Sequence, residues 1–403
     1  MHFLKSFYHF FLAWLGSVVY RHPSRKLFVI GVTGTKGKST VIELINAILE
    51  AASRRTALIS SVRIKVADGS KPNFMGMSMP GRFYLQKFLK KAADLDCQYA
   101  IIEVTSQGIL QYRDRFIDFN AAILTNLEPE HIEAHGSFEK YRDSKVRFFE
   151  NVAKCSAKPE KVFLINSRAR DAAYFTRAAE KFGKTLFYSK EDIAKIKLKT
   201  KLIGEFNLEN IAAAVTFARS QKIDWEIIKN AIEGFDGVPG RLEFVQKEPF
   251  AAVIDYAHTP DSLEKVYQTL KGGKHQKRLI CVLGAAGGGR DIWKRPVMGE
   301  IAAKYCDQII LTNEDPFDED PAKILSEIKS GISKTQFPIS KLSEIVDRKS
   351  AIKKAIQSAK KGDTVIITGK GSESSIRVAG GKKIPWNEKE VVAKILNNER
   401  IEI

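Results

Sequence analysis

The chain has 403 residues, of which 44% are hydrophobic and 13 are prolines. This length predicts two domains, and the composition excludes a disordered or fibrous protein. The formal net charge is +18 at pH 7, yet lysines and arginines are spread through every segment, without the long basic run of a nucleic-acid tail. We therefore expect a solvated basic surface and no nucleic-acid partner. The charge is also compatible with an anionic membrane surface or a polyanionic small substrate as a partner.

The four cysteines lie far apart, without a Cys-x-x-Cys pair or a histidine at metal-binding distance in the sequence. This spacing argues against a disulfide framework and against a zinc site. It indicates a reducing compartment, so we expect a cytoplasmic protein.

The first segment in chain order is strongly apolar. Residues 7–20 read FYHFFLAWLGSVVY, and the basic stretch 21–26 follows them. A helix of this length rises about 21 Å, which is too short for a bilayer span, and no signal-peptide cleavage site follows. The sequence predicts a helix packed on the body of the protein. A peripheral contact of residues 3–20 with the inner membrane face is the alternative.

Short β-branched runs alternate with amphipathic helical stretches in the following segment. The strand-like runs are 27–32, 99–104, 121–125 and 161–165, and residues 40–52 have helical spacing. This alternation predicts a parallel-rich sheet covered by helices on both faces.

A second series of the same kind begins after the turn-rich residues 235–240. Its strand-like runs are 251–255, 278–283, 308–312 and 364–368, and its helices lie near 261–270, 295–305 and 347–360. The predicted fold class is therefore α/β, with a Rossmann-like C-terminal domain. The predicted boundaries are 1–26 for an apolar helix and linker, 27–238 for the central domain and 239–403 for the C-terminal domain.

The sequence GVTGTKGKST at 31–40 has the features of a phosphate-binding loop. It follows a predicted strand and opens a helix, which is the context that such a loop requires. Its glycines let backbone N–H groups turn toward phosphate oxygens, and the helix N-terminus adds partial positive charge. Lys38 is predicted to reach the β- and γ-phosphates, and Ser39 to bind Mg²⁺. The glycines at 31, 34 and 37 depart from the standard spacing, which would place glycine at Val32.

That glycine pattern resembles the Mur ligases and their folylpolyglutamate synthetase relatives, whose loop reads G-x-T-G-T-N-G-K-[ST]-[ST]. Lys36 stands here in place of the asparagine. The segments EVTSQGILQYR and TNLEPEHIEAHGSFEKYRDSKVRFF are similar to the Mur ligase branch that adds the third peptide residue. Further matches are GEFNLEN at 204–210, VPGRLE at 238–243 and DYAHTPDSLEKV at 255–266. The resemblance covers nearly the whole chain and implies a phosphate-loop central domain.

The resemblance also implies roles for individual residues. The nucleotide-binding residues would be Gly34, Thr35, Lys36, Gly37, Lys38, Ser39, Thr40, Asn207, Arg241, Asp255 and His258. The Mg²⁺ ligands would be Ser39, Glu103, His131 and Lys145, with Lys145 carbamylated and a pair of Mg²⁺ ions bound. The catalytic residues would be Lys38, Glu103, His131 and Lys145. Without the resemblance, His131 would be read as a polar loop residue. Glu130 replaces the aspartate of the family motif, and Gln107 replaces a histidine.

Two further sets of residues would bind the substrates. Thr105 and Arg113 would contact the acceptor. The residues at the incoming amino acid would be Arg290, Asn313, Asp315, Gly369 and Glu373. Diaminopimelate-adding enzymes carry an arginine where this chain has Phe317, and that arginine grips the distal carboxylate of the substrate. Since Phe317 cannot make this bidentate contact, the sequence argues against diaminopimelate and leans toward L-lysine.

The implied activity is that of an ATP-dependent, ADP-forming acid–amino-acid ligase. It would add an amino acid to a muramoyl-peptide acceptor through an acyl phosphate, in peptidoglycan precursor synthesis. Residues 1–26 stand where the family has a UDP-binding domain, so we expect most of that domain to be missing. A soluble or lipid-linked acceptor without UDP, or a folylpolyglutamate-type reaction, is the alternative. A nucleic-acid-stimulated NTPase is a different class of hypothesis. We expect a monomer.

Overall fold

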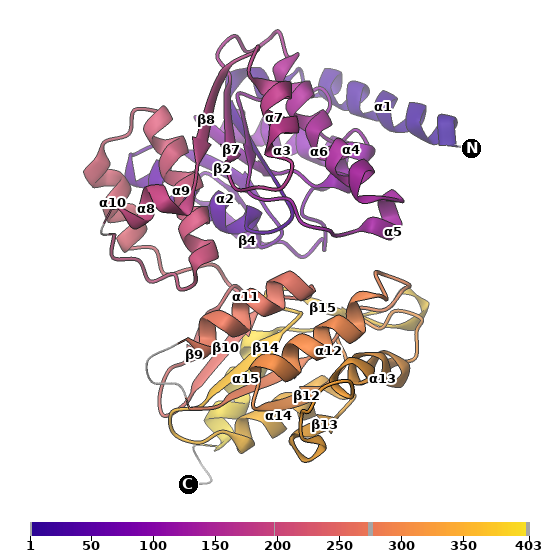
Figure 1. Ribbon diagram of the computed structural model, residues 1–403. Helices are drawn as coiled ribbons and strands as arrows, with labels where there is room; N and C mark the ends of the chain where they lie inside the picture. Colours follow the sequence, from indigo (N-terminus) through magenta and orange to yellow (C-terminus); the bar gives the residue numbers. More distant parts are fainter. Residues whose placement is uncertain (1, 197, 273–276, 400–403) are drawn as a thin grey trace. The chain divides into compact units, whose positions relative to one another are not determined.

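Two α/β units, residues 1–236 and 237–403, make up the chain (Figure 1). The computed structural model describes residues 2–196, 198–272 and 277–399. Each unit contains a mostly parallel sheet with helices on both faces, which confirms the predicted α/β fold. The predicted apolar runs become buried strands whose bounds differ from the expected ones by at most one residue.

The sheet of the first unit is built around the strand that leads into the phosphate loop. The strands are β1 (Phe28–Thr33), β2 (Thr56–Ile59), β3 (Arg63–Val66), β4 (Gly69–Pro72), β5 (Tyr99–Glu103), β6 (Ala121–Leu124), β7 (Val162–Asn166) and β8 (Lys184–Tyr188). Within the described residues their order is β4-β3-β2-β5-β1-β6-β7-β8. Strands β2, β5, β1, β6, β7 and β8 run parallel, and β3 and β4 form an antiparallel edge. The carboxyl ends of β1, β5 and β6 therefore meet at one edge of the sheet.

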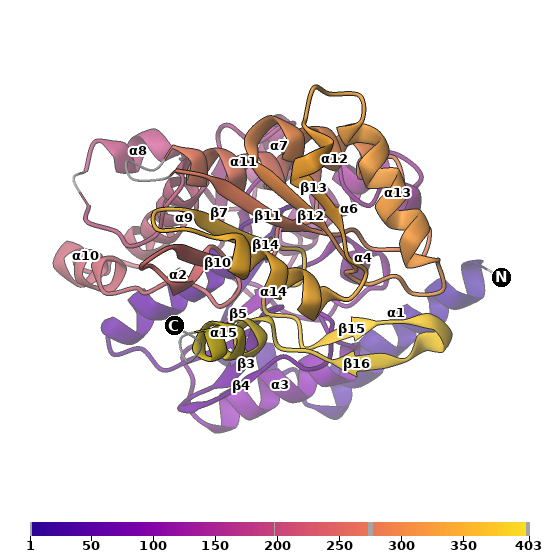
Figure 2. The same cartoon turned by 90° about the horizontal axis from the view of Figure 1, so that it is seen from below.

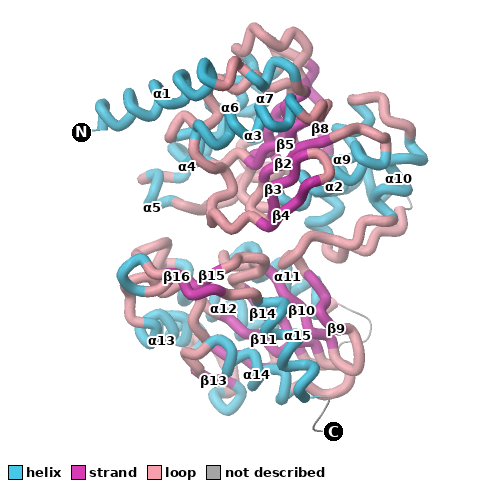
Figure 3. Tube along the Cα trace, turned by 180° about the vertical axis from the view of Figure 1, so that it is seen from behind, coloured by secondary structure: helices cyan, strands magenta, loops and turns pink. Residues whose placement is uncertain are grey.

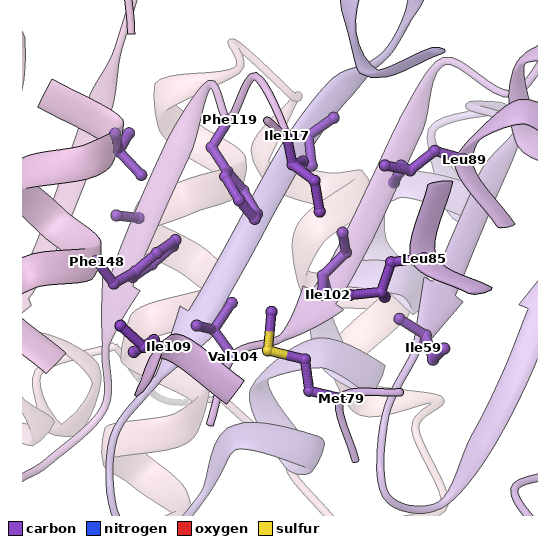
Figure 4. Close-up of a cluster of buried hydrophobic side chains, with 14 of the residues drawn as sticks. Ile59, Met79, Leu85, Leu89, Ile102, Val104, Ile109, Ile117, Phe119 and Phe148 are labelled. Atoms are coloured by element: carbon purple, nitrogen blue, oxygen red, sulfur yellow. The ribbon is translucent and has the colours of Figure 1, made fainter. Parts of the chain in front are cut away.

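Helices cover both faces of this sheet. They are α1 (His2–Val19), α2 (Lys38–Ala51), α3 (Arg82–Asp94), α4 (Ser106–Leu110), α5 (Ile132–His135), α6 (Phe138–Ala153), α7 (Ala172–Ala179), α8 (Lys190–Ala194), α9 (Glu205–Ser220) and α10 (Trp225–Glu233), with a 3₁₀ turn at Pro23–Lys26. Alternate side chains of one strand enter opposite cores. Ile30 packs with α2, α9 and α10, whereas Val29 packs with α3, α6 and α7. Figure 4 shows part of the core that contains Val29, including Ile102, Phe119 and Phe148.

The second unit has a separate sheet and core. Its strands are β9 (Glu243–Gln246), β10 (Ala251–Asp255), β11 (Leu279–Leu283), β12 (Gln308–Leu311), β13 (Leu342–Glu344), β14 (Thr364–Thr368), β15 (Ser375–Arg377) and β16 (Lys383–Pro385). Its helices are α11 (Pro260–Lys271), α12 (Lys294–Tyr305), α13 (Pro321–Ile332), α14 (Arg348–Ser358) and α15 (Glu388–Glu399), with 3₁₀ turns at Ile339–Lys341 and Ala379–Gly381. The main sheet order is β13-β12-β11-β14-β10-β9, with only β9 antiparallel among the described strands. Helices α14 and α15 pack on one face, and Figure 2 shows α11 to α13 on the other.

The predicted N-terminal helix is present as α1 and packs against α3, but it begins five residues before the predicted run 7–20 and ends one residue earlier. Figures 1 and 3 show that it extends along the side of the first unit, with its N-terminal end beyond the neighbouring helices. Among the described residues, no helix combines the length and the apolarity needed to cross a membrane.

Candidate active site

The phosphate loop joins the end of β1 to the start of α2, and two of its glycines have left-handed backbone geometry. Gly34 has φ +142° and Gly37 has φ +81°, a region that disfavours residues with a side chain. A Cβ atom on Gly34 would lie 2.0 Å from Thr125 Oγ1, and one on Gly37 would lie 2.3 Å from Asn210 Oδ1. Glycine is thus required at both positions by backbone geometry and by close neighbours.

The segment after β6 holds the loop in place. Thr125 Oγ1 donates to the carbonyl of Lys36 at 2.6 Å, and the side chain of Asn126 bonds both the N–H and the carbonyl of Lys36. The hydroxyl of Thr35 lies 3.0 Å from the hydroxyl of Tyr141 on α6 and accepts from the N–H of Glu128. These bonds fix the loop between β6 and α6, so its N–H groups are held in one arrangement.

Two lysines converge on carbonyl groups of the loop. Lys38 Nζ donates to the carbonyls of Gly34 and Thr35 at 3.0 and 2.9 Å. Lys145, on α6, is only 2% exposed, and its Nζ donates to the Gly34 carbonyl at 2.9 Å. Burial, with the nearby charge of Lys38 as a further cause, holds the pKa of Lys145 well below its usual value. Lys145 is therefore predisposed to be a neutral amine.

Oxygen donors lie beside this loop at the ends of β5 and β2. Glu103 Oε2 accepts from Ser39 Oγ at 3.2 Å and from the Ser61 N–H at 2.8 Å. The hydroxyls of Ser39 and Ser61 are 2.8 Å apart. A carboxylate and a hydroxyl at a phosphate loop are the hard donors that Mg²⁺ prefers, so this set fits a phosphate-bound Mg²⁺.

His131 lies farther along the segment that follows β6. It has φ +56° at the start of α5, and its ring centroid lies 6.4 Å from that of Tyr141. His135 is buried against the same tyrosine and lies 3.1 Å from Ser106 Oγ. Burial, and then the charges of His131 and Lys145, lower the pKa of His135 to about 4. In the described part of the chain, no three His, Cys, Asp or Glu side chains form a metal-binding group by themselves.

The remaining predicted nucleotide residues of the first unit lie on α2 and α9. Thr40 is buried in the first turn of α2. On α9, Asn207 donates to the Ile203 carbonyl at 2.8 Å and accepts from Asn210 Nδ2 at 3.0 Å. Because Asn210 also borders Gly37, this pair connects α9 with the loop.

The two predicted acceptor residues have structural partners within the first unit. The hydroxyl of Thr105 accepts from the Gly108 N–H at 3.1 Å and caps α4. Arg113 donates to the carbonyl of Met79 and, at 2.7 Å, to Gln111 Oε1. Burial lowers the pKa of Arg113. Both side chains are thus held in defined positions. Thr105 lies in the short connection between β5 and α4, which begins directly after Glu103.

The nucleotide residues predicted in the second unit cluster at its start. The carboxylate of Asp255 accepts from the N–H groups of Leu242 and Ala257, both at 2.7 Å. The guanidinium of Arg241 lies over the ring of Tyr256, 4.3 Å from its centroid. The His258 ring lies 4.6 Å from the same tyrosine ring, with Nδ1 2.6 Å from the Tyr256 carbonyl. The structure brings Arg241 and His258 together at the ring of Tyr256, and Asp255 precedes this tyrosine in the chain.

The predicted amino-acid residues fall into two connected groups. Lys370 Nζ donates to Asp315 Oδ1 at 2.8 Å and to Glu373, whose other oxygen accepts from Tyr256 at 2.9 Å. The guanidiniums of Arg290 and Arg377 lie 4.6 and 5.7 Å from the ring centroid of Phe317.

Two backbone positions support these groups. The Asn313 carbonyl accepts from Arg348 at 3.0 Å. Gly369 has φ +105°, and a Cβ there would lie 2.6 Å from Glu314 Oε2. The motifs 313–317 and 369–373 are therefore adjacent in space.

Comparison with known proteins matches both units. The family model described as the Mur ligase middle domain matches residues 32–218, and the Mur ligase glutamate ligase domain matches residues 240–371. A relative from Syntrophomonas wolfei, named UDP-N-acetylmuramoyl-L-alanyl-D-glutamate--2,6-diaminopimelate ligase, is 35% identical over 96% of this chain and 82% of its own length. The chain belongs to the Mur ligase family.

Other Mur ligases agree with this assignment. The UDP-N-acetylmuramyl-tripeptide synthetase of a Roseiflexus species is 34% identical over 94% of this chain and 80% of its own length. The solved structure of a UDP-N-acetylmuramoyl-L-alanyl-D-glutamate--2,6-diaminopimelate ligase is 28% identical, with a TM-score of 0.60, and the match covers 93% of this chain and 79% of that one. The family and the fold predicted from the sequence are confirmed.

Sequence reasoning did not select several side chains that this Mur ligase places at the loop. Thr125, Asn126 and Tyr141 lie in the matched segment 125–149 and hold the loop, but no role was predicted for them. Asn210 lies next to Gly37, and its place as the second asparagine of GEFNLEN was the sequence signal that could have identified it. Ser61 follows β2, a short strand that the apolar pattern did not reveal.

Proposed function

We propose that the chain is an acid–amino-acid ligase that cleaves ATP to ADP and phosphate while extending a muramoyl-peptide acceptor by one amino acid. The observation that carries the proposal is the group formed by Lys38, Ser39, Glu103 and the buried Lys145 around the phosphate loop. A simple ATP-binding module needs the loop, but it does not need a buried lysine with a lowered pKa beside it. The names of the relatives support the same class of reaction.

The proposed reaction has two steps. An oxygen of the acceptor carboxylate attacks the γ-phosphorus of ATP, the bond to the bridging oxygen of ADP breaks, and an acyl phosphate forms. The neutral amine of the incoming amino acid then attacks the carbonyl carbon, loses a proton to solvent and expels phosphate. Lys38 and the loop N–H groups neutralise charge on the transferring phosphoryl group, and positioning provides much of the remaining rate enhancement.

Mg²⁺ would supply further neutralisation of phosphate charge when bound, and Ser39, Glu103 and His131 are the residues proposed to hold a pair of these ions. Lys145 has a separate proposed role. A neutral amine adds to CO₂ and releases one proton, and the resulting carbamate is an anionic oxygen donor. The lowered pKa of Lys145 favours the neutral amine that this modification requires.

The remaining assignments form part of the same proposal. Thr105 and Arg113 would contact the acceptor. The nucleotide would be bound by Gly34, Thr35, Lys36, Gly37, Thr40, Asn207, Arg241, Asp255 and His258. The incoming amino acid would be bound by Arg290, Asn313, Asp315, Gly369 and Glu373. The domain boundaries would be 1–26, 27–238 and 239–403, and the reaction would take place in the cytoplasm, at or near the inner face of the membrane.

An ADP-release assay tests this proposal. UDP-N-acetylmuramoyl-L-alanyl-D-glutamate and its UDP-free form are each combined with L-lysine, diaminopimelate or other amino acids. We expect ADP release only when ATP, one acceptor and one amino acid are present together, with an amide product confirmed by mass spectrometry. ADP release that needs neither acceptor nor amino acid, or that DNA or RNA stimulates, would refute the ligase proposal.

Phe317 provides a separate test of amino-acid selectivity. Two of the relatives named above are diaminopimelate ligases, whereas the ring of Phe317 provides no guanidinium at this position. We expect Phe317→Arg to raise the kcat/KM ratio of diaminopimelate over lysine by about 10- to 100-fold. Phe317→Leu, which adds no charge, is the matched control. An unchanged ratio in Phe317→Arg would remove residue 317 from the selectivity site.

A further inference from the structure

Helix α1 exposes a continuous apolar face. Phe7, Phe11, Trp14 and Val18 follow the i, i+4, i+7, i+11 spacing of one helical stripe, and each is between 42% and 62% exposed. We call these four residues the outward face. The rings of Phe7 and Phe11 stack with centroids 6.4 Å apart, and Phe11 lies 5.7 Å from Trp14. The aromatic side chains of the outward face therefore contact one another and remain accessible to solvent.

The opposite side of the same helix carries the smaller residues. Ala13, Gly16 and Ser17 are buried, and a Cβ added to Gly16 would lie 3.6 Å from Gln86 and 3.7 Å from Phe83 on α3. A helix whose sole role is packing on a protein body turns its large apolar residues inward. Helix α1 differs from this arrangement, because Ala13, Gly16 and Ser17 pack against the first unit while Phe7, Phe11 and Trp14 face outward.

The aromatic contacts of Phe10 show that α1 has a fixed orientation on the first unit. Its ring packs edge-on against Phe116 and Tyr112, with centroids 5.1 and 5.7 Å away. The hydroxyl of Ser6 also lies 2.9 Å from that of Tyr112. The outward face cannot turn inward by a simple rotation of α1 without losing these contacts and those of Ala13 and Gly16.

The charge around this helix indicates what covers the outward face. Residues 6–20 contain no lysine, arginine, aspartate or glutamate, and the first acidic residue of the chain is Glu43. Arg21, Arg25 and Lys26 directly follow the helix and are exposed, and Arg25 also pairs with Asp118 at 3.5 Å. An aromatic stripe with a cationic flank complements the apolar boundary and the anionic headgroups of a phospholipid surface.

We propose that α1 is an interfacial helix whose outward face inserts into the surface of an anionic phospholipid bilayer. The helix lies along the bilayer surface, since it lacks the combination of length and apolarity needed to cross it, and Arg21, Arg25 and Lys26 contact the headgroups. The contact holds the first unit at the membrane without a transmembrane segment. This inference does not depend on the proposed reaction, because lipid binding is measured without ATP, acceptor or amino acid.

Vesicle sedimentation of the full chain tests the contact. We expect binding to vesicles of phosphatidylcholine with phosphatidylglycerol to exceed binding to phosphatidylcholine alone by about fivefold or more, and to weaken as salt is added. Replacing Phe7, Phe11 and Trp14 together by serine should reduce binding about tenfold or more. Brominated acyl chains should quench tryptophan fluorescence in the wild type but not in Trp14→Phe.

A matched variant controls for the loss of exposed aromatic residues in general. Phe74, Phe182 and Phe187 are also exposed in the first unit, and replacing these three by serine should leave vesicle binding unchanged. Circular dichroism and the melting temperature establish that both triple variants are folded. Equal binding by the two triple variants, or no binding of the wild type to anionic vesicles, would overturn the proposal.

A second copy of the chain is the competing occupant. Sedimentation velocity without vesicles separates the two explanations. We expect a monomer for both the wild type and the variant with serine at residues 7, 11 and 14. A wild-type dimer that this variant abolishes would show that the outward face is a protein interface, and would overturn the membrane assignment.

Discussion

Two buried lysines, one in each unit, have opposite electrostatic environments. Lys145 is 2% exposed and donates to the Gly34 carbonyl, whereas Lys370 is fully buried and pairs with Asp315 and Glu373. Burial lowers the pKa of Lys145, and the charge of Lys38 lowers it further. Burial alone would also lower the pKa of Lys370, but the charges of Glu373 and Asp315 outweigh that effect and raise it.

The difference separates two uses of the same side chain. At Lys145, burial and the charge of Lys38 outweigh the opposing charges of Glu130 and Glu103, so this lysine is favoured as a neutral amine, which is reactive toward CO₂. A lysine between two carboxylates stays charged and holds both acids in place. The comparison therefore predicts a chemical role for Lys145 and a structural, substrate-positioning role for Lys370.

The largest effect is expected at Lys145. Lys145→Ala should lower kcat by about 10²–10³-fold, because it removes the proposed carbamate beside the phosphoryl group. Added short carboxylic acids should restore part of the activity by supplying the missing anionic oxygens. The assay is steady-state ADP release with and without acetate.

Lys158→Ala is the matched control for Lys145. Lys158 is also buried, donates to the carbonyls of Arg25 and Leu27, and has a pKa lowered mainly by burial. This variant should change the melting temperature while leaving kcat within about twofold of the wild type. If both alanine variants lose activity equally, or if acetate restores neither, Lys145 has no special chemical role.

The next largest effect concerns stability at Lys370. Lys370→Met should destabilise the second unit by about 3–5 kcal/mol, since it leaves the buried carboxylate of Asp315 without its cation, whereas Glu373 is 37% exposed and contributes less. Urea unfolding measures this change. Lys389→Met provides the control, because the exposed Lys389 pairs with Glu243 at 2.7 Å and should contribute less than about 1 kcal/mol. Equal effects of the two substitutions would contradict the assigned role of Lys370.

Glu314 provides a pH-dependent test in the same unit. Burial raises its pKa from 4.5 to about 7, and the charge of Lys370 only partly opposes this shift. The folded state thus holds this proton more tightly than the unfolded chain, so stability falls as the pH rises from 4.5 to about 7. Glu314→Gln should therefore stabilise the protein by about 2–3 kcal/mol at pH 8 and by little at pH 4.5. An unchanged or lowered unfolding free energy at pH 8 would contradict the assigned environment.

The smallest effect is expected at Lys36 in the phosphate loop. Lys36 forms a partly buried ion pair with Glu130 at 2.8 Å, and both residues depart from the family motif. Lys36→Asn and Glu130→Asp should each raise the KM for ATP by about 3- to 10-fold, while the double variant should recover most of the loss. A double-mutant cycle tests this coupling, with Lys190→Asn at an exposed pair as the control. Additive effects would show that the two substitutions are independent.

The sequence predicts the central part of the fold because buried parallel strands are continuous apolar runs. Strands β10 and β14 lie at the predicted residues 251–255 and 364–368. The antiparallel strands β3 and β4 were not predicted. Strand β3 has only four residues, and β4 reads GSKP and is exposed along its length. Such a strand depends on its neighbours for its conformation and carries no apolar signal of its own.

In the candidate site, too, some features could be predicted from local sequence patterns and others depend on contacts between distant segments. The phosphate loop and Glu103 follow from local patterns at strand ends. The contact of Glu103 with Ser61 joins residues 42 positions apart and depends on the placement of β2. The burial of Lys145 likewise depends on the packing of α6 against the loop, which no local pattern specifies. The sequence therefore identified Glu103 and Lys145 as site residues, but the burial that lowers the pKa of Lys145 could be seen only in the structure.

The transfer of oxygen from the acceptor to phosphate tests the central claim most directly. The acceptor is prepared with ¹⁸O in its reacting carboxylate and turned over with ATP and the amino acid. We predict that each released phosphate carries one ¹⁸O atom, because the carboxylate oxygen bonds to phosphorus before the amine displaces it. Phosphate without ¹⁸O, released together with the amide product, would contradict an acyl-phosphate mechanism.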